Sequence, residues 1–170
     1  ITSLAKFGHI DPLLTWKFPI SMAFIFVLML CVYGPIFIFE KAFKLVSNVT
    51  LVELTNVNSD LMHRFAEEAP GTFQHSLQVS NLATDAAKRI GANALLVRAG
   101  ALYHDIGKME NPAFFTENQS GKNPHDGLSY EKSAQIIIQH VESGMKLADK
   151  YRLPKAVSDF ICTHHGCSRT

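Results

Sequence analysis

The chain has almost no net charge. Its 16 lysines and arginines balance 15 aspartates and glutamates, which leaves a formal charge of +1 over 170 residues. Proteins that hold a nucleic-acid polymer normally present a strongly basic surface to the phosphate backbone. The balance of charge therefore argues against a nucleic-acid polymer as the main partner.

Cysteine is also scarce. The three cysteines, Cys31, Cys162 and Cys167, are odd in number and follow no framework spacing, so no disulfide scaffold is expected. Cys162 and Cys167 flank His164 and His165, a grouping that a zinc knuckle can also show. Donors crowded on one short segment usually belong to a site completed elsewhere in the fold, and we favour that interpretation.

Strand patterns are absent, because no segment alternates apolar and polar residues with a period of two. After a break at residues 69–71, apolar residues recur with helical spacing in four segments, so we predict an all-α bundle. The boundaries expected for these helices are Gly91 after the first, Asn93 and Asp105 for the second, Ser129 before the third, and Pro154 and Gly166 for the fourth. The apolar face expected for the first helix consists of Val79, Leu82, Ala83, Ala86 and Ile90.

Charged residues are absent from Ile20 to Phe39, and a helix of that length spans about 30 Å, the thickness of the hydrocarbon core of a bilayer. Lys17 and Glu40 border the run, and Trp16 and Tyr33 are placed to serve as interfacial aromatic residues. We favour a transmembrane helix over the alternative of a buried core helix. A signal peptide is disfavoured, because the apolar run is too long and no small-residue cleavage site follows it.

These features divide the chain into a membrane-flanking segment (1–19), a transmembrane helix (20–39), a connector (40–69) and a helical domain (70–170). The chain begins at Ile1 without a methionine and stops at Thr170, shortly after the last predicted helix. We therefore expect a fragment whose helical domain is incomplete at its C-terminus. A loop of about two dozen residues after Asp105 is expected to be functional, since loops of this length inside a compact domain usually are.

Histidine is frequent, with eight residues, and five of them lie at the inward faces or ends of the predicted helices. These five are His75, His104, His140, His164 and His165, and Asp105 directly follows His104. A single histidine on an apolar face is more often a hydrogen-bonded core residue than a ligand. Five neutral imidazoles in one small core would each need a buried polar partner, and metal ions supply such partners.

The imidazole and carboxylate donors of this set are too many for one tetrahedral centre, so two ions of iron, manganese or zinc are expected. Asp105 has two carboxylate oxygens and can bridge them. Two cations about 3.5–4 Å apart can activate a shared water and hold the attacking and leaving oxygens of a phosphoryl transfer. The donor set therefore predicts a phosphoester hydrolase.

The order of these residues resembles the HD superfamily of metal-dependent phosphohydrolases. Along the chain it is His75, the dyad His104-Asp105 followed by Ile-Gly-Lys108, then His140, and finally the pair at 164–165. Four motifs are also similar to those of the seven-transmembrane HD family of the PgpH type. These motifs are Glu68 to Ser76, Tyr103 to Met109, Glu117 to Gln119 and Asn123 to Asp126. The resemblance covers about residues 35–166 and includes the last membrane helix before the HD domain.

The resemblance implies a multi-pass protein of the inner (cytoplasmic) membrane whose HD domain, facing the cytoplasm, hydrolyses cyclic di-AMP to the linear dinucleotide. The implied metal ligands are His75, His104, Asp105, His140, His164 and His165, with Asp105 as the bridge, and iron or manganese is favoured. A further aspartate ligand of the family belongs to a later helix, so we expect one metal site to be incomplete in this fragment.

Beside the dyad, Lys108 is expected to neutralise charge on the scissile phosphate, with a structural salt bridge as the alternative. His125 is expected to contact the substrate, with a plain turn as the alternative. Two other functions stay open, namely hydrolysis of another nucleotide and nucleotide sensing by a receptor module without turnover. The expected partners are a cyclic dinucleotide and the lipid bilayer, and a homodimer is also open.

Overall fold

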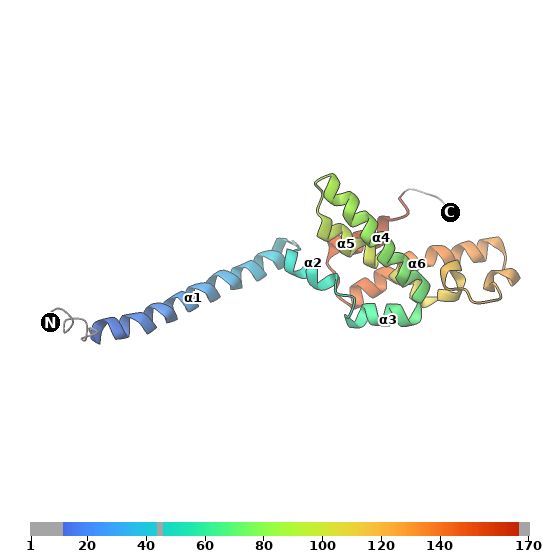
Figure 1. Ribbon diagram of the computed structural model, residues 1–170. Coiled ribbons are helices and arrows are strands. Elements are labelled where there is room, and N and C mark those ends of the chain that lie inside the picture. The colour runs from blue at the N-terminus through green and yellow to red at the C-terminus, as the bar shows by residue number, and fades with distance from the viewer. Residues whose placement is uncertain (1–11, 44–45, 167–170) are drawn as a thin grey trace, which may run out of the picture. The chain divides into compact units, whose positions relative to one another are not determined.

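The computed structural model describes residues 12–43 and 46–166, and Figure 1 shows their helices. The chain divides into two compact units between Leu45 and Val46, and each unit is considered by itself. All regular secondary structure in these described ranges is helical, with no strand. The prediction of an all-α fold is confirmed.

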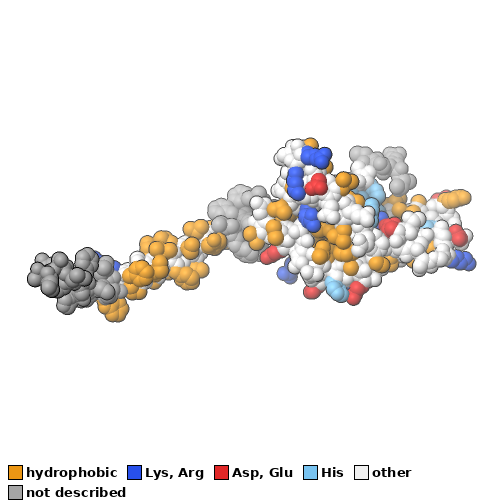
Figure 2. All heavy atoms as spheres, viewed as in Figure 1, with side chains coloured by type: hydrophobic (Ala, Val, Ile, Leu, Met, Phe, Trp, Pro, Cys, Tyr) orange, Lys and Arg blue, Asp and Glu red, His pale blue; other side chains and the backbone are white. Residues whose placement is uncertain are grey.

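The first unit is a single long helix, α1 (Pro12–Phe43). Its segment Trp16–Tyr33 has a mean hydropathy of 1.8, and none of it is buried, so this helix is long and apolar enough to cross a membrane. In Figure 2, most of the side chains that are coloured by type along this helix are hydrophobic. The predicted span 20–39 lies inside α1, whereas residues 1–11 of the predicted flanking segment lie outside the described residues.

The second unit contains six α-helices and four short 3-10 helices among the described residues. In chain order these are α2 (Asn48–Leu54), α3 (Asp60–Glu68), α4 (Pro70–Arg89), α5 (Ala94–Tyr103), η1 (Ile106–Glu110), η2 (Pro112–Phe114), η3 (Thr116–Asn118), η4 (Pro124–Gly127), α6 (Tyr130–Lys150) and α7 (Lys155–Thr163).

The predicted helix boundaries at Gly91, Asn93 and Ser129 match the structure, whereas α5 ends at Tyr103 and α7 at Thr163, before the predicted ends at Asp105 and Gly166. The side chain of Asn93 accepts a hydrogen bond from the Leu96 amide at the start of α5, and Ser129 caps α6 in the same way. Gly91 follows α4 with φ +71°, a left-handed conformation that favours glycine. Pro154 is the N-cap of α7 and not its first helical residue, because its ψ of 143° is extended.

The core of the second unit is built around α5, which packs against α2, α4 and α7. Its buried residues include Ala99, Leu102 and Tyr103. The segment 40–69 also contributes to this core, through Leu51, Leu61, Met62 and Phe65. The part of the chain expected to act as a connector therefore supplies two helices that stabilise the domain by burying apolar surface.

The predicted apolar face of α4 is wrong. Leu82 and Ile90 are 75% and 80% exposed. The residues that α4 buries are small, namely Thr72, Ser76, Ser80, Thr84 and Ala87. Small side chains let α4 lie close beside α5 (Figure 1), and the Ser80 and Thr84 hydroxyls donate to backbone carbonyls of their own helix, which lowers the cost of burying them.

The loop after the dyad is more regular than its composition suggested. Residues 106–127 form the four 3-10 helices η1 to η4, joined by short irregular segments. Pro112 and Pro124 occupy the first positions of η2 and η4, where a proline costs no backbone hydrogen bond. This ordered loop connects the dyad to α6.

Candidate metal centre

The dyad lies where α5 gives way to η1. His104 is the C-cap of α5, and Asp105 precedes the first residue of η1. Gly107 lets η1 pack backbone against backbone on α6, because a Cβ at this position would overlap the carbonyl oxygen of His140. The close approach of these two elements places the carboxylate of Asp105, which is only 4% exposed, beside the His140 ring.

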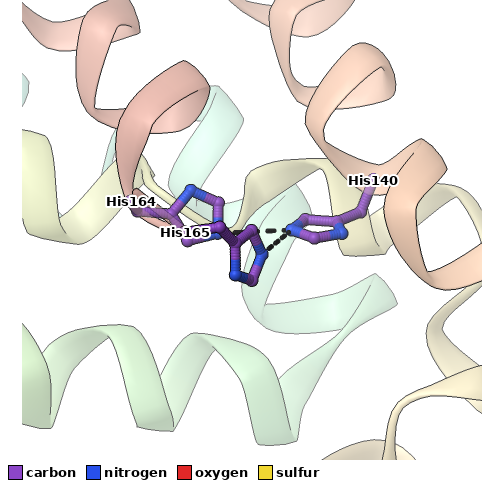
Figure 3. A group of neighbouring side chains, drawn as sticks. All are labelled: His140, His164 and His165. Carbon is purple, nitrogen blue, oxygen red and sulfur yellow. Dashed lines mark hydrogen bonds between the residues drawn. The ribbon is translucent and has the colours of Figure 1, made fainter. Parts of the chain in front are cut away.

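Two groups of metal-type donors gather in this region. In one, the donor atoms of His75, His104 and Asp105 all lie within 4.8 Å of one another. In the other, the donors of His140, His164 and His165 satisfy the same distance. Figure 3 shows His164 and His165, from the end of α7, pointing at the His140 ring on α6. The structure therefore brings together all six residues for which the sequence predicts metal ligation.

Asp105 faces both groups with different oxygens. Its Oδ2 lies 3.2 Å from Nε2 of His104. Its Oδ1 lies 3.4 Å from Nε2 of His164 and 3.6 Å from Nε2 of His140. One buried carboxylate thus lies between the two donor groups, which is the arrangement that a bridging ligand requires.

The hydrogen bonds of the rings fix which nitrogen faces the centre. Nδ1 of His104, His140 and His164 donates in each case to the carbonyl three residues earlier, namely Ala101, Ile137 and Ile161. A neutral imidazole that donates through Nδ1 has only a lone pair at Nε2. The three Nε2 atoms therefore point into the centre as acceptors, oriented by their own helices as metal-binding histidines usually are.

Lone pairs that face one another need a cation between them. Nε2 of His140 lies 3.3 Å from Nε2 of His164 and 3.1 Å from Nε2 of His165. A single proton can satisfy one such pair, whereas a divalent metal ion accepts all three nitrogens and the neighbouring carboxylate. The donor set and its orientation fit a metal ion.

The titration behaviour of the centre agrees with its donor roles. Burial by itself raises the pKa of Asp105, but hydrogen bonds from His104 and His164 and the nearby charge of Lys108 outweigh burial and hold the pKa far below its usual range. Burial lowers the pKa of His140. Burial and the neighbouring His164 likewise lower the pKa of His165. Burial lowers the pKa of His104, but its hydrogen bond to Asp105 outweighs burial and raises it, so a metal ion that binds Nε2 of His104 displaces a proton from that atom.

Lys108 is held at the edge of the centre. Its Nζ lies 2.9 Å from Asp105 Oδ2 and 2.8 Å from Glu117 Oε1, and 4.9 Å from the centre of the Phe115 ring. Burial lowers the pKa of Lys108, but the charges of Asp105 and Glu117 and their hydrogen bonds raise it above its usual value. The ammonium group therefore stays charged beside the Asp105 carboxylate.

Glu117 and Asn118 have roles that the sequence did not assign. Both bind Thr72 in the first turn of α4, since Thr72 Oγ1 donates to Glu117 Oε1 at 3.0 Å and the Thr72 amide donates to Asn118 Oδ1 at 3.0 Å. This contact ties the loop to the helix that carries His75. The motif at 117–119 was visible in the sequence, but spacing alone does not reveal a partner 45 residues away.

His125 takes part in a different local structure. Its Nε2 donates to the carbonyl of Phe114 at 3.0 Å, and its ring packs edge-on against the Phe114 ring. Asn123 accepts a hydrogen bond from the His125 amide, which forms the turn at η4. His125 belongs to neither of the two donor groups.

Comparison with known proteins identifies related sequences and structures. The family model of the HD domain matches residues 72–170. The cyclic-di-AMP phosphodiesterase PgpH of Listeria monocytogenes is 46% identical over 134 residues, which are 78% of this chain and 19% of that protein. The cyclic-di-AMP phosphodiesterase PgpH of Bacillus subtilis is 44% identical over 131 residues, which are 76% of this chain and 18% of that protein. The chain thus spans about a fifth of the length of these curated relatives.

A solved structure shows the same fold. The crystal structure of the HD domain of the L. monocytogenes phosphodiesterase PgpH, in complex with cyclic di-AMP, matches with a TM-score of 0.64 and 45% sequence identity. The match covers 66% of this chain and 53% of that one. The helical arrangement described above is therefore shared with an HD domain.

Proposed function

Because the chain belongs to the HD domain family, we propose that it is part of a membrane-tethered, metal-dependent phosphodiesterase that hydrolyses cyclic di-AMP to the linear dinucleotide. The observation that carries the proposal is the position of Asp105, whose two oxygens face two separate donor groups. The activity named for the two PgpH relatives and the cyclic di-AMP bound in the related structure support the choice of substrate.

The proposed ligands of two divalent ions are the six residues of the centre, with Asp105 shared between the ions. Iron or manganese suits a set made of imidazole and carboxylate without thiolates. When bound, such a pair of ions supplies an activated water and stabilises the attacking and leaving oxygens at phosphorus. The overall reaction adds water to one phosphodiester bond and releases a ribose 3′ oxygen.

The side chains of the chain itself orient this chemistry. Asp105 remains ionised, and its oxygens lie beside Nε2 of His104 and His164, whose rings are oriented by the Nδ1 hydrogen bonds to their own helices. The Lys108 ammonium lies beside the same carboxylate and is positioned to offset negative charge on the scissile phosphate. We assign His104, Asp105 and Lys108 to catalysis, and Lys108 and His125 to substrate contact.

We further propose that α1 spans the cytoplasmic membrane as the last of several spans, which places the HD domain in the cytoplasm with its substrate. Trp16 and Tyr33, at the two ends of the apolar segment, are 71% and 67% exposed, and aromatic residues at such ends favour the membrane interface. We keep the divisions 1–19, 20–39, 40–69 and 70–170 as the proposed parts of the chain. A homodimer is compatible with this arrangement.

The test uses the full-length protein, purified with its metal. Asp105→Ala is expected to remove most of the bound metal and to reduce hydrolysis of cyclic di-AMP by at least about 100-fold. Asp85→Ala is the matched control, because Asp85 is a surface carboxylate on α4 whose side chain is 70% exposed. Hydrolysis that persists in metal-free buffer would falsify the proposal, and binding without turnover by the metal-loaded protein would favour a receptor.

A further inference from the structure

An open cavity of about 650 Å³ lies between η4 and the N-terminal part of α6. Its volume falls within the range of about 300–1,000 Å³ that is usual for small-molecule sites. None of the six proposed metal ligands lines it. The cavity is therefore distinct from the metal centre.

One wall of the cavity leads to the metal centre. Tyr130, Ser133 and Ile137 line it, and they precede His140 by 10, 7 and 3 residues. At 3.6 residues per turn these positions share one face of α6, and they lie between about 4.5 and 15 Å from His140 along the helix axis. The Ile137 carbonyl accepts the Nδ1 hydrogen bond of His140, so the inner end of the cavity adjoins the centre.

A second connection runs through the loop. The neighbouring residues Phe114 and Phe115 contact His125 and His140 respectively, with ring centroids 5.0 and 5.7 Å apart. His125 lines the cavity, whereas His140 belongs to the metal centre. The consecutive aromatic residues Phe114 and Phe115 thus link a residue that lines the cavity to a residue of the metal centre.

The charges around the cavity indicate which part of a nucleotide it can bind. Asp126 and Glu131 line it, and within the described ranges 12–43 and 46–166 no lysine or arginine does. Carboxylates repel a phosphate but accept hydrogen bonds from an amino group. Ile137 and the ring of Tyr130, which is 96% exposed, add surface suited to a flat, largely apolar ring. The lining is therefore suited to a nucleobase and not to a phosphate.

We propose that this cavity holds one adenine base of the cyclic dinucleotide while a phosphodiester lies at the metal centre. Tyr130 stacks on the base, Ile137 contacts the end nearer the ribose, and Asp126 accepts from the exocyclic amine. His125 then contacts the substrate as part of the base site. The identity of the base rests on the proposed function, whereas the existence of the site rests on the cavity.

The experiment measures binding of adenosine, a nucleoside without phosphate, to the full-length protein by calorimetric titration. Stacking on an aromatic side chain contributes about 1–3 kcal/mol per base, so Tyr130→Ala is expected to weaken adenosine binding about 5- to 150-fold. Tyr130→Phe keeps the ring and is expected to restore binding. Leu82→Ala, an exposed apolar residue on α4, is the control for loss of surface area. Equal adenosine affinity in wild type and Tyr130→Ala, or no adenosine binding to wild type, overturns the base site.

A parallel assay separates the two proposals. The kcat/KM for cyclic di-AMP is compared with that for bis(p-nitrophenyl) phosphate, a diester without a base. Tyr130→Ala is expected to lower the ratio of the two values about 10-fold, through KM for cyclic di-AMP. A protein that binds adenosine through Tyr130 but hydrolyses neither diester retains the base site and loses the proposed function. A protein that hydrolyses cyclic di-AMP with an unchanged ratio in Tyr130→Ala loses the base site alone.

Discussion

The Nε2 atoms of His140 and His164 lie 3.3 Å apart, and each ring already donates its Nδ1 hydrogen to a carbonyl of its own helix. Two neutral rings in this state present lone pairs to each other, which is unfavourable without a cation. The helices α6 and α7 thus hold their histidines in a geometry that a bound ion stabilises.

Metal binding is therefore expected to stabilise the fold. An ion present at about 100 times its dissociation constant adds about 2.7 kcal/mol to the free energy of unfolding. Chelation should lower the melting temperature of the full-length protein, and His140→Ala should have a low melting temperature that chelator changes less than that of wild type, because one of the two donor groups is lost. His63→Ala serves as the control, because the His63 side chain on α3 is 70% exposed. An equal response of His140→Ala and wild type to chelator would argue against this role.

Substitution of Lys108 is expected to affect turnover more than binding. Lys108→Met removes the charge that we propose offsets the phosphate in the transition state, and the expected loss in kcat is about 100-fold. Lys88→Met, an exposed lysine on α4, is the matched control. Steady-state kinetics with cyclic di-AMP would separate kcat from KM. An unchanged kcat would leave Lys108 with only a structural ion pair.

Glu117→Gln keeps the shape of the side chain but weakens its hold on the Lys108 ammonium group. We expect a fall in kcat of about 10-fold with bound metal unchanged, because Glu117 acts through Lys108 and belongs to neither donor group. Metal analysis and kinetics on the same preparation check both parts. Loss of metal from Glu117→Gln would contradict this assignment and place Glu117 in the metal centre.

Gly107→Ala is expected to destabilise the domain by about 1–3 kcal/mol, since the added methyl group forces η1 away from the His140 carbonyl. Gly127→Ala is the matched control, because nothing lies within 4 Å of a Cβ there. Urea unfolding of the two variants would measure the difference. Similar stabilities of both variants would show that η1 and α6 need no such close contact.

The proposal that α1 spans a membrane predicts the effect of a charge within its apolar segment. Leu28→Arg places a charge in the middle of the apolar segment and is expected to disfavour insertion by about 3 kcal/mol, whereas Leu28→Ile should insert normally. The fraction of this chain, produced without other membrane spans, that resists alkaline extraction from membranes measures the effect. If Leu28→Arg and wild type are retained equally, α1 does not depend on lipid contact at this position.

The sequence predicted the helical fold because helix signals are local, and it predicted the grouping of the donors because residues at the inward faces and ends of packed helices meet in the core. Asn93 and Ser129 act through capping hydrogen bonds within a few residues, and the five histidines lie on or at the ends of helices. The order of the motifs along the chain also indicated the resemblance to the HD family. These signals require no knowledge of how distant segments pack.

The buried face of α4 and the role of Glu117 could not be predicted in this way. Helix periodicity assumes that apolar residues face the core, whereas α4 buries Ser76, Ser80 and Thr84 so that α5 can approach closely. Glu117 acquires its role only when the loop folds back onto Thr72. Both features are set by contacts between segments far apart in the chain.

The ligands proposed for the two ions come from α4, the junction of α5 and η1, α6 and the end of α7. Loss of the ions would release all of these elements at once and raise the population of partly unfolded chains that proteases recognise. A cell deprived of the metal would then degrade this protein faster, so its abundance, and with it the proposed hydrolysis of cyclic di-AMP, would follow metal supply even at constant synthesis.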